Sequence, residues 1–503
     1  MRTILDRLRR LGRNIRRGPR QYVRHLALGL GILVAAVGYA FLAFFPVLAL
    51  VSLAHLPRAV LSAHSSAAWL QVAGLGGAAA LGTAMTGMLV AMRAPPPRGY
   101  EVNGEKAPAL FALLGELDQA YGGPRIHRVF VTERFEARVL RAPRFGLPAL
   151  YENALVLGLP LLLTLSPTEF RVALGRCMGR LSLARNPVTG RLYHLRQTWA
   201  YYRDTQGPAP LRWVAGGFFA AYCPLYEWAS RRAACLDELA ADLYAAETVA
   251  HEDVAEAIVA TVVNARFLDE KFWPALNSTR GKAPRPPHLP YSTMVRAFAH
   301  GVKEDERRLW LKEALAEQGD SKGPVPCLEK RLDNIGHQRA GLPERAAEHA
   351  GRRYMGRALT EAQKHFDREW LRANAAQWRR SYREWQEGRS RIQALQQKAG
   401  EALSKHEIGE YIELVRRHAR PADVPALYQG LLERRPRDAD LHWCLGRMLA
   451  MANDARGVPV LERAMDLDER YGVPACRLIA RLRQSQAGPG AAPTGPTPRT
   501  HAA

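Results

Sequence analysis

Two long stretches near the N-terminus contain no charged residue, and they constrain the fold more than any other feature. The first is Leu26–Ala54, and Ala67–Met92 follows after a short link that holds one arginine, Arg58. About 20 apolar residues let a helix cross a bilayer, whereas the apolar core of a signal peptide has roughly 7–15. Both stretches exceed these lengths, so they predict two transmembrane helices. Because the second is rich in Gly and Ala, which permit close helix contact, we expect a packed hairpin.

The N-terminal arm predicts the orientation of this hairpin. Residues 1–24 contain nine arginines and one aspartate. Basic flanks stay on the cytoplasmic side, so the N-terminus is predicted to be cytoplasmic, and two crossings return the chain to that side at Arg93. We interpret the arm, residues 1–25, as a topology signal that also attracts anionic membrane lipid. It is poor in aromatic residues, which disfavours nucleic acid as a partner.

Composition leaves several partners open but limits the compartment. The chain has 503 residues and a formal net charge of +23, a balance that suggests nucleic acid, anionic lipid or only an arginine-rich proteome. Its cysteines are scattered without a C-x-x-C pair, which indicates neither a disulfide framework nor a zinc ribbon. They fit a reducing compartment in which thiols fill the core. The six are Cys177, Cys223, Cys235, Cys327, Cys444 and Cys476.

A small β-sheet is predicted after the stiff linker Ala94–Gly99. The apolar spacing of residues 106–121 predicts an amphipathic helix. Three short alternating or apolar runs then predict strands. They are His127–Thr132, Glu136–Leu140 and Asn153–Leu157.

The next stretch, Leu159–Ser182, predicts a helix with a well-defined start. Ser166 is a candidate N-cap, Pro167 fits the first helical position, and Glu169 completes a capping box. Many zinc peptidases carry H-E-x-x-H on such a helix, because two histidines at i and i+4 share one face and the Glu serves as general base. Here the five positions read Arg-Cys-Met-Gly-Arg, residues 176–180.

The remainder of the chain is predicted to be largely helical. Ala233–Val249 predicts a helix, and Phe272–Pro287 is rich in Pro and basic residues and predicts a loop. Residues 346–420 contain a long charged helix with an aromatic stripe typical of core packing. Residues 421–486 predict short helices resembling a degenerate tetratricopeptide pair, in which a Leu-Glu-Arg triplet that starts at Leu432 recurs at Leu461. The tail, residues 487–503, has a disordered composition.

This order of parts resembles the membrane-anchored zinc metallopeptidases of the HtpX and CAAX prenyl protease type, particularly the bacterial variety with a C-terminal helical repeat region. The resemblance covers roughly residues 100–390. Four stretches carry it: Asn153–Ser182, the E-x-x-A-D match Glu238–Asp242, Phe272–Pro274 and Leu328–Leu332.

The resemblance implies a fold, a division into domains and a location. The fold is mainly α with a small β-sheet, a zincin-like metallopeptidase domain behind two transmembrane helices, and a C-terminal helical repeat-like region. The location is the bacterial inner membrane, with both termini and the soluble domain cytoplasmic. The predicted domains are the basic arm (1–25), the two transmembrane helices (26–92) and the metallopeptidase-like domain (100–345). They are followed by the long helical extension (346–420), the tetratricopeptide-like region (421–486) and the disordered tail (487–503).

The residues that perform the family's chemistry are replaced. The resemblance assigns Arg176 and Arg180 to the two histidine ligands, Cys177 to the catalytic Glu, Glu238 to the third ligand and Asp242 to its helix partner. Arginine stays protonated and cannot ligate zinc. We therefore expect no intact catalytic site and no cofactor; zinc would be needed only if the family activity is retained. A Cys–His hydrolase centred on Cys177 lacks a histidine placed by the sequence.

The replaced residues suggest a substitute for the metal. Arg176 and Arg180 are spaced i and i+4, so they occupy the face that two histidines would use. We hypothesise that they replace the cation as partners of Glu238, because a buried carboxylate without a partner is costly. The alternative is that both arginines reach solvent from an eroded cleft. Guanidinium groups within ~6 Å of Glu238 distinguish the first arrangement.

These observations favour a pseudopeptidase that binds protein or peptide partners through its cleft and C-terminal helices. The resemblance implies that the strand before the metal-site helix aligns the substrate, so Asn153–Leu157 is the candidate for holding an extended segment. Such binding needs an edge strand and pockets but no metal. The alternative function is an active zinc metalloendopeptidase acting on membrane or cytosolic proteins. A third class, a membrane-associated nucleic-acid binder, rests only on charge.

Overall fold

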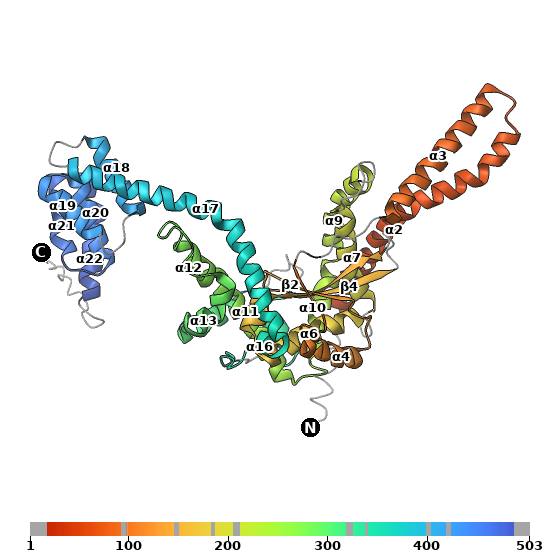
Figure 1. Cartoon of the computed structure of the whole chain (residues 1–503), viewed down its shortest axis with the longest axis horizontal. Coiled ribbons are helices and arrows are strands. Elements are labelled where there is room, and N and C mark those ends of the chain that lie inside the picture. The colour runs from red at the N-terminus through yellow and green to blue at the C-terminus, as the bar shows by residue number, and fades with distance from the viewer. Residues whose placement is uncertain are drawn as a thin grey trace, which may run out of the picture. The chain divides into compact units, whose positions relative to one another are not determined.

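The computed structural model describes residues 18–91, 97, 99–144, 150–182, 187–204, 212–317, 325–337, 341–398, 404–418 and 424–486. The molecule is mainly helical, with one four-stranded sheet and two long apolar N-terminal helices (Figure 1), which confirms the coarse fold prediction. Most of the basic arm, most of the Ala94–Gly99 linker and the tail 487–503 lie outside the described residues.

The described chain divides into two compact units. The first contains the residues up to Ser278 together with His288–Leu371, and the second contains Thr279–Pro287 and the residues from Arg372 onward. The boundary falls within one long helix, α17 (Arg357–Lys398).

The N-terminal hairpin consists of α2 (Gly18–Leu61) and α3 (Ser66–Ala91). Leu26–Leu61 and Ser66–Ala91 are long and apolar enough to span a membrane. The helices pack closely at Gly82, where a Cβ atom would lie 2.7 Å from the backbone nitrogen of Ala49. Both helices expose large apolar side chains, which are costly in water. Examples are Leu26, Leu33, Leu50, Trp69, Leu70 and Leu81.

The sheet has the strand order β1-β2-β4-β3. β2 and β4 are parallel, and the two outer pairs are antiparallel. The four strands are β1 (Tyr100–Val102), β2 (Arg128–Thr132), β3 (Ala137–Pro143) and β4 (Tyr151–Gly158).

The prediction that Asn153–Leu157 offers a free edge is wrong. These residues lie in β4, where Leu155 faces Val129 of β2 on one side and Val139 of β3 on the other. A continuous apolar run such as Ala-Leu-Val-Leu is typical of an interior strand covered on both faces. The outer strands of the sheet are β1 and β3.

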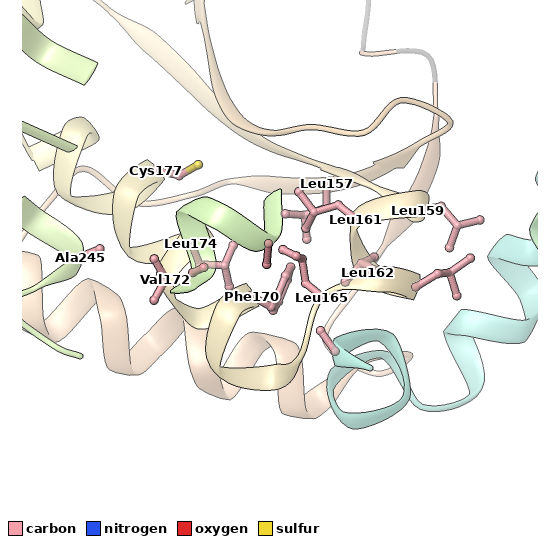
Figure 2. Packing of buried hydrophobic residues seen from close by; sticks show 14 of the residues in the cluster. Leu157, Leu159, Leu161, Leu162, Leu165, Phe170, Val172, Leu174, Cys177 and Ala245 are labelled. Atoms are coloured by element: carbon pink, nitrogen blue, oxygen red, sulfur yellow. The ribbon is translucent and has the colours of Figure 1, made fainter. Parts of the chain in front are cut away.

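The core of the first unit lies between the sheet and α6 (Pro167–Ser182). The predicted capping box is confirmed: Ser166 N–H donates to Glu169 at 2.6 Å, and Glu169 N–H donates to the Ser166 hydroxyl at 3.2 Å. Figure 2 shows Leu157, Phe170 and Leu174 in the buried cluster. This core also receives α4 (Pro108–Tyr121), α5 (Leu159–Thr164), α10 (Arg231–Ala245) and α11 (His251–Phe267).

A second cluster joins the hairpin to α7 (Pro187–Arg203) and α9 (Gly217–Ala229). Gly38 of α2 packs closely against Trp199: a Cβ atom added at this glycine would lie 3.0 Å from the Trp199 ring. Tyr222 donates its hydroxyl proton to the carbonyl of Val34 at 2.7 Å. The first half of α2 is therefore part of a folded core.

The segment Phe272–Pro287 is not entirely a loop, so that prediction is wrong in part. Trp273–Ser278 forms α12, which follows η3 (Leu268–Phe272) without a break, so Pro274 lies inside a continuous helical run, directly after its π-helical turn. The remaining elements of the first unit are η2 (Arg212–Gly216), η3 (Leu268–Phe272), α13 (Pro290–His300), α14 (Glu304–Ala316), α15 (Leu328–Asn334) and α16 (Ala350–Met355).

The second unit contains two successive helix pairs. α19 (Val424–Arg434) with α20 (Ala439–Met451) is followed by α21 (Gly457–Leu467) with α22 (Gly472–Gln486), and α18 (Lys405–His418) precedes them. The offset from the start of α19 to that of α21 equals the offset from α20 to α22, and it is larger than the spacing of the two Leu-Glu-Arg triplets. Buried residues follow the same offset as the helix starts, as in the pairs Tyr428/Leu461, Leu431/Ala464 and Leu449/Leu482.

Candidate functional site

Two glycines bring α6 unusually close to α10. A Cβ atom at Gly179 would lie 2.3 Å from the Cβ of Tyr244, and one at Gly175 would lie 3.4 Å from the Cα of Ala245. Real Cβ atoms do not approach at the first distance, so glycine is required at residue 179. Because the glycines are spaced i and i+4, their arginine neighbours in the sequence emerge beside the contact.

The structure brings together Arg176, Arg180 and Glu238. One Glu238 oxygen, Oε2, lies 3.1 Å from a terminal nitrogen of Arg176 and 2.9 Å from a terminal nitrogen of Arg180. The Glu238 side chain is only 13% exposed, and both arginines are similarly covered. This is the arrangement of the metal-substitute hypothesis, and neither arginine extends into solvent.

Asp242 is held by two arginines in the same way. Its side chain has no exposed surface, and Nε of Arg176 lies 2.7 Å from Oδ1. Arg331 of α15 donates two hydrogen bonds to the two carboxylate oxygens, at 2.9 and 2.8 Å. Sequence reasoning missed Arg331, although it lies in the Leu328–Leu332 stretch. The signal was that the hypothesis gave both arginines of residues 176–180 to Glu238 and left Asp242 without a cation.

Asp237 is a further member that sequence reasoning missed. Its Oδ2 lies 3.1 Å from Nε of Arg180, whose guanidinium also donates to the hydroxyl of Tyr193 at 3.1 Å. We call Arg176, Arg180, Asp237, Glu238, Asp242 and Arg331 the charge cluster. It contains three guanidinium groups and three carboxyl groups, so its formal charges balance.

The charge cluster shifts the pKa values of its acids in different directions. Burial raises the pKa of a carboxyl, but the charges of Arg180 and Arg176 outweigh burial and hold the pKa of Glu238 below its usual range. Arg176 and Arg331 do the same for the pKa of Asp242. Burial dominates at Asp237 and raises its pKa to about 6. Glu238 and Asp242 are therefore ionised acceptors at neutral pH.

Cys177 lies beside the cluster but is poorly suited to be a nucleophile. Its thiol donates to the carbonyl of Ala137 in β3 at 3.2 Å. Burial raises the pKa of the thiol, so the reactive thiolate is disfavoured despite the nearby arginines. Figure 2 shows Cys177 on α6 at the margin of the hydrophobic cluster.

The residues at this site do not fit the zinc ion that the family resemblance implies. Oε2 of Glu238 and both carboxylate oxygens of Asp242 are engaged by guanidinium groups, which carry no lone pair for a metal. Across the part of the chain that the structure describes, no group of three or more His, Cys, Asp or Glu side chains could hold a metal ion. The chemistry available here is ion pairing.

The outer edge of β3 is covered by a side-chain amide. The carbonyl of Gln197, on α7, accepts from the N–H of Arg141 at 3.2 Å, and its NH₂ group donates to the carbonyl of Val139 at 3.3 Å. A peptide group of a neighbouring strand would make the same two bonds. An extended segment could pair with β3 only after Gln197 moves.

Fold and site together define a mainly helical protein with a membrane-length hairpin and a buried charge cluster between two helices. No family model, no curated protein and no solved structure matches the chain. The resemblance seen in the sequence therefore stays a prediction.

Proposed function

We propose that this protein is a membrane-anchored relative of zinc metallopeptidases that has lost catalysis and acts by binding protein or peptide partners. The observation that carries the proposal is the pair of contacts between Glu238 and the guanidinium groups of Arg176 and Arg180. In the proposed ancestry these arginines stand at the two histidine positions, so fixed positive charge replaces the metal while the Lewis acid is lost.

The hairpin supports the location in this proposal. Two apolar helices of membrane length expose large side chains that lipid would cover. The basic N-terminal arm supports a cytoplasmic orientation of both termini, in a bacterial inner membrane if the ancestry holds.

The helices of the second unit support the proposal that the protein binds a partner. α19 and α20 are repeated by α21 and α22 at one constant offset, as the units of a helical repeat would be. Tetratricopeptide units, which have a period of about 34 residues, stack helix pairs in this way into binding surfaces. The amide-covered edge of β3 is a second candidate surface for an extended peptide.

Metal analysis with a protease assay tests the loss of catalysis. Full-length protein purified in detergent without added zinc should contain far less than one equivalent of zinc and should not cleave casein. Stoichiometric zinc together with chelator-sensitive cleavage would establish the alternative, an active zinc metalloendopeptidase.

Reversal of the replaced residues tests the ancestry. The triple variant R176H/C177E/R180H places two imidazoles opposite Glu238, so we expect about one equivalent of bound zinc. The single variant C177E is the matched control and should bind none. A folded triple variant that binds no zinc would show that these positions do not correspond to a metal-binding helix.

A further inference from the structure

A pocket with a volume of about 600 Å³ lies between the hairpin, the sheet and α7. α2 contributes Ile32, Ala35, Ala36 and Tyr39, and α7 contributes an apolar wall that includes Leu192 and Leu195. The polar groups at the pocket are two guanidinium groups, two phenol hydroxyls and an imidazole, and none of them is a carboxylate. They belong to Arg141, Arg191, Tyr39, Tyr151 and His194.

The pocket lies at the base of the hairpin. Gly82 of α3 packs against Phe45 and Ala49 of α2. Because the two helices are antiparallel, the end of α3 at Ala91, nine residues further on, lies beside about residue 38 of α2. The pocket residues of α2, 32–39, therefore occupy the level at which a bilayer containing the hairpin would end.

The two arginines of the pocket have no anion. Within the described residues neither Arg141 nor Arg191 forms an ion pair with a carboxylate, and the Nε of Arg141 is buried without a hydrogen-bond acceptor. The Arg141 guanidinium lies over the Tyr151 ring, 4.2 Å from its centroid. Arg141 is partly buried, whereas Arg191 is exposed. A weakly hydrated guanidinium group beside apolar side chains favours a multivalent oxyanion such as phosphate.

We propose that this pocket binds the phosphate headgroup of an anionic phospholipid. The phosphate would contact Arg141 and Arg191 beside the phenol groups of Tyr39 and Tyr151, which interact with each other, and an acyl chain would follow Ile32 and Ala36 along the hairpin. Basic pockets on the cytoplasmic side of membrane helices bind lipid headgroups by this combination of charge and apolar surface. The inference rests on the proposed insertion of the hairpin in a membrane.

Counting retained lipids tests the site. Full-length protein reconstituted with phosphatidylglycerol and phosphatidylcholine is transferred to detergent, and bound lipid is counted by native mass spectrometry. The variant R141Q/R191Q should retain at least fivefold less phosphatidylglycerol. The matched control R379Q/R380Q removes two exposed arginines of the second unit and should retain as much as the parent.

A second variant separates lipid loss from misfolding. Ala36→Trp fills the pocket from an exposed position of α2, leaves both arginines in place and should also reduce retained lipid. Unchanged phosphatidylglycerol in both variants would overturn the proposal. Displacement of the lipid by about 10 mM inorganic phosphate, enough to saturate a weak anion site, would assign the site to free phosphate and overturn the lipid assignment.

The proposed anchor is tested separately. Extraction of membranes with alkaline carbonate should leave the parent protein and both variants in the pellet. Release of the parent protein would refute the anchor, whereas pelleted variants that keep their phosphatidylglycerol refute only the lipid site.

Discussion

At the scale of single residues, the charge cluster depends on two of its buried carboxylates, Glu238 and Asp242, having two cations each. Asp242 is entirely buried between Arg176 and Arg331, so loss of one arginine leaves a charge that water cannot reach. Breaking such a pair is far more costly than replacing both partners by apolar groups. A single substitution in the cluster therefore leaves a buried charge without its partner and lowers the stability of the fold.

Arg331→Met should lower the free energy of unfolding by about 3–5 kcal/mol, because Asp242 keeps only Arg176 as a partner. Denaturant or thermal unfolding in detergent measures this change in the free energy of unfolding. The matched control is Arg128→Met, which removes a two-bond contact with Glu101 on the exposed surface and should cost about 1 kcal/mol or less. Equal, small losses in both variants would show that Asp242 is not held as described.

His194 gives the first unit a dependence on pH. Burial lowers the pKa of His194 to about 3, so the folded state keeps the ring neutral while the unfolded chain takes up a proton below its usual value near 6.5. Stability is present above that value and is lost as the pH falls. The loss should approach about 1.4 kcal/mol per pH unit between pH 6 and pH 4.

The variant His194→Gln isolates this effect. Unfolding of both proteins is followed from pH 7.5 to pH 4.5, and the stability advantage of the parent over the variant should shrink as the pH falls. A constant difference across this range would mean that His194 is not the group responsible.

The i and i+4 spacing placed Arg176 and Arg180 on one helix face, and the family resemblance, which assigns Glu238 to the third ligand, predicted that Glu238 lies opposite them. Arg331 and Asp237 could not be found that way. Arg331 is 89 residues from Asp242 in the sequence, and no periodic pattern connects the two. Asp237 directly precedes the E-x-x-A-D match that starts at Glu238, so the match does not include it.

At the scale of elements, the contact between α6 and α10 decides the site. Glycine at residue 179 allows an approach that any side chain would block. The sequence Gly-Arg-Cys-Met-Gly-Arg, residues 175–180, contained this signal, but the pattern alone does not say which helix its two glycines meet. A local pattern predicts the helix, whereas the distance to its neighbour depends on residues far away in the sequence.

Gly179→Ala should destabilise the first unit by about 1–3 kcal/mol or more, since the added methyl group overlaps Tyr244. It should also lengthen the contacts between Glu238 and both arginines. Gly115→Ala in α4 is the control: nothing lies within 4 Å of its Cβ position, so alanine should be neutral or stabilising there. Comparable melting temperatures for the two variants would contradict the close contact.

Strands and repeats show the same limit at this scale. The run Asn153–Leu157 predicted a strand correctly, but its partners on both sides come from other parts of the chain, so its interior position was not readable. The spacing between the two Leu-Glu-Arg triplets is shorter than the repeat length that the helix starts define. The reason is that the triplets occupy non-equivalent turns of α19 and α21. Helix starts and buried positions agree with each other on the longer offset.

At the scale of the whole molecule, the hairpin and the first unit fold as one body. Val34, Gly38 and the ring of Trp199 share a core with α7 and α9. A division after the second apolar helix, natural from composition, cuts through this core. Composition predicted the membrane-length helices, but it could not predict that half of α2 packs on folded protein.

A chain that begins at Arg93 should therefore not yield a stable soluble protein. Loss of α2 uncovers Trp199, Phe219 and Leu192, an apolar surface that favours aggregation. Size-exclusion chromatography without detergent should show aggregates, while the full-length chain in detergent is monodisperse. A monodisperse truncated protein with the melting temperature of the parent would contradict the shared core.

The guanidinium groups of the charge cluster differ from a metal in one respect that matters to a cell: they cannot dissociate. A zinc centre must be loaded after synthesis, competes with other sites for a scarce ion and is emptied when supply fails. Here the positive charge is encoded in the gene and is present as soon as the two helices meet. Formation of this contact between the helices is therefore independent of the cell's metal supply.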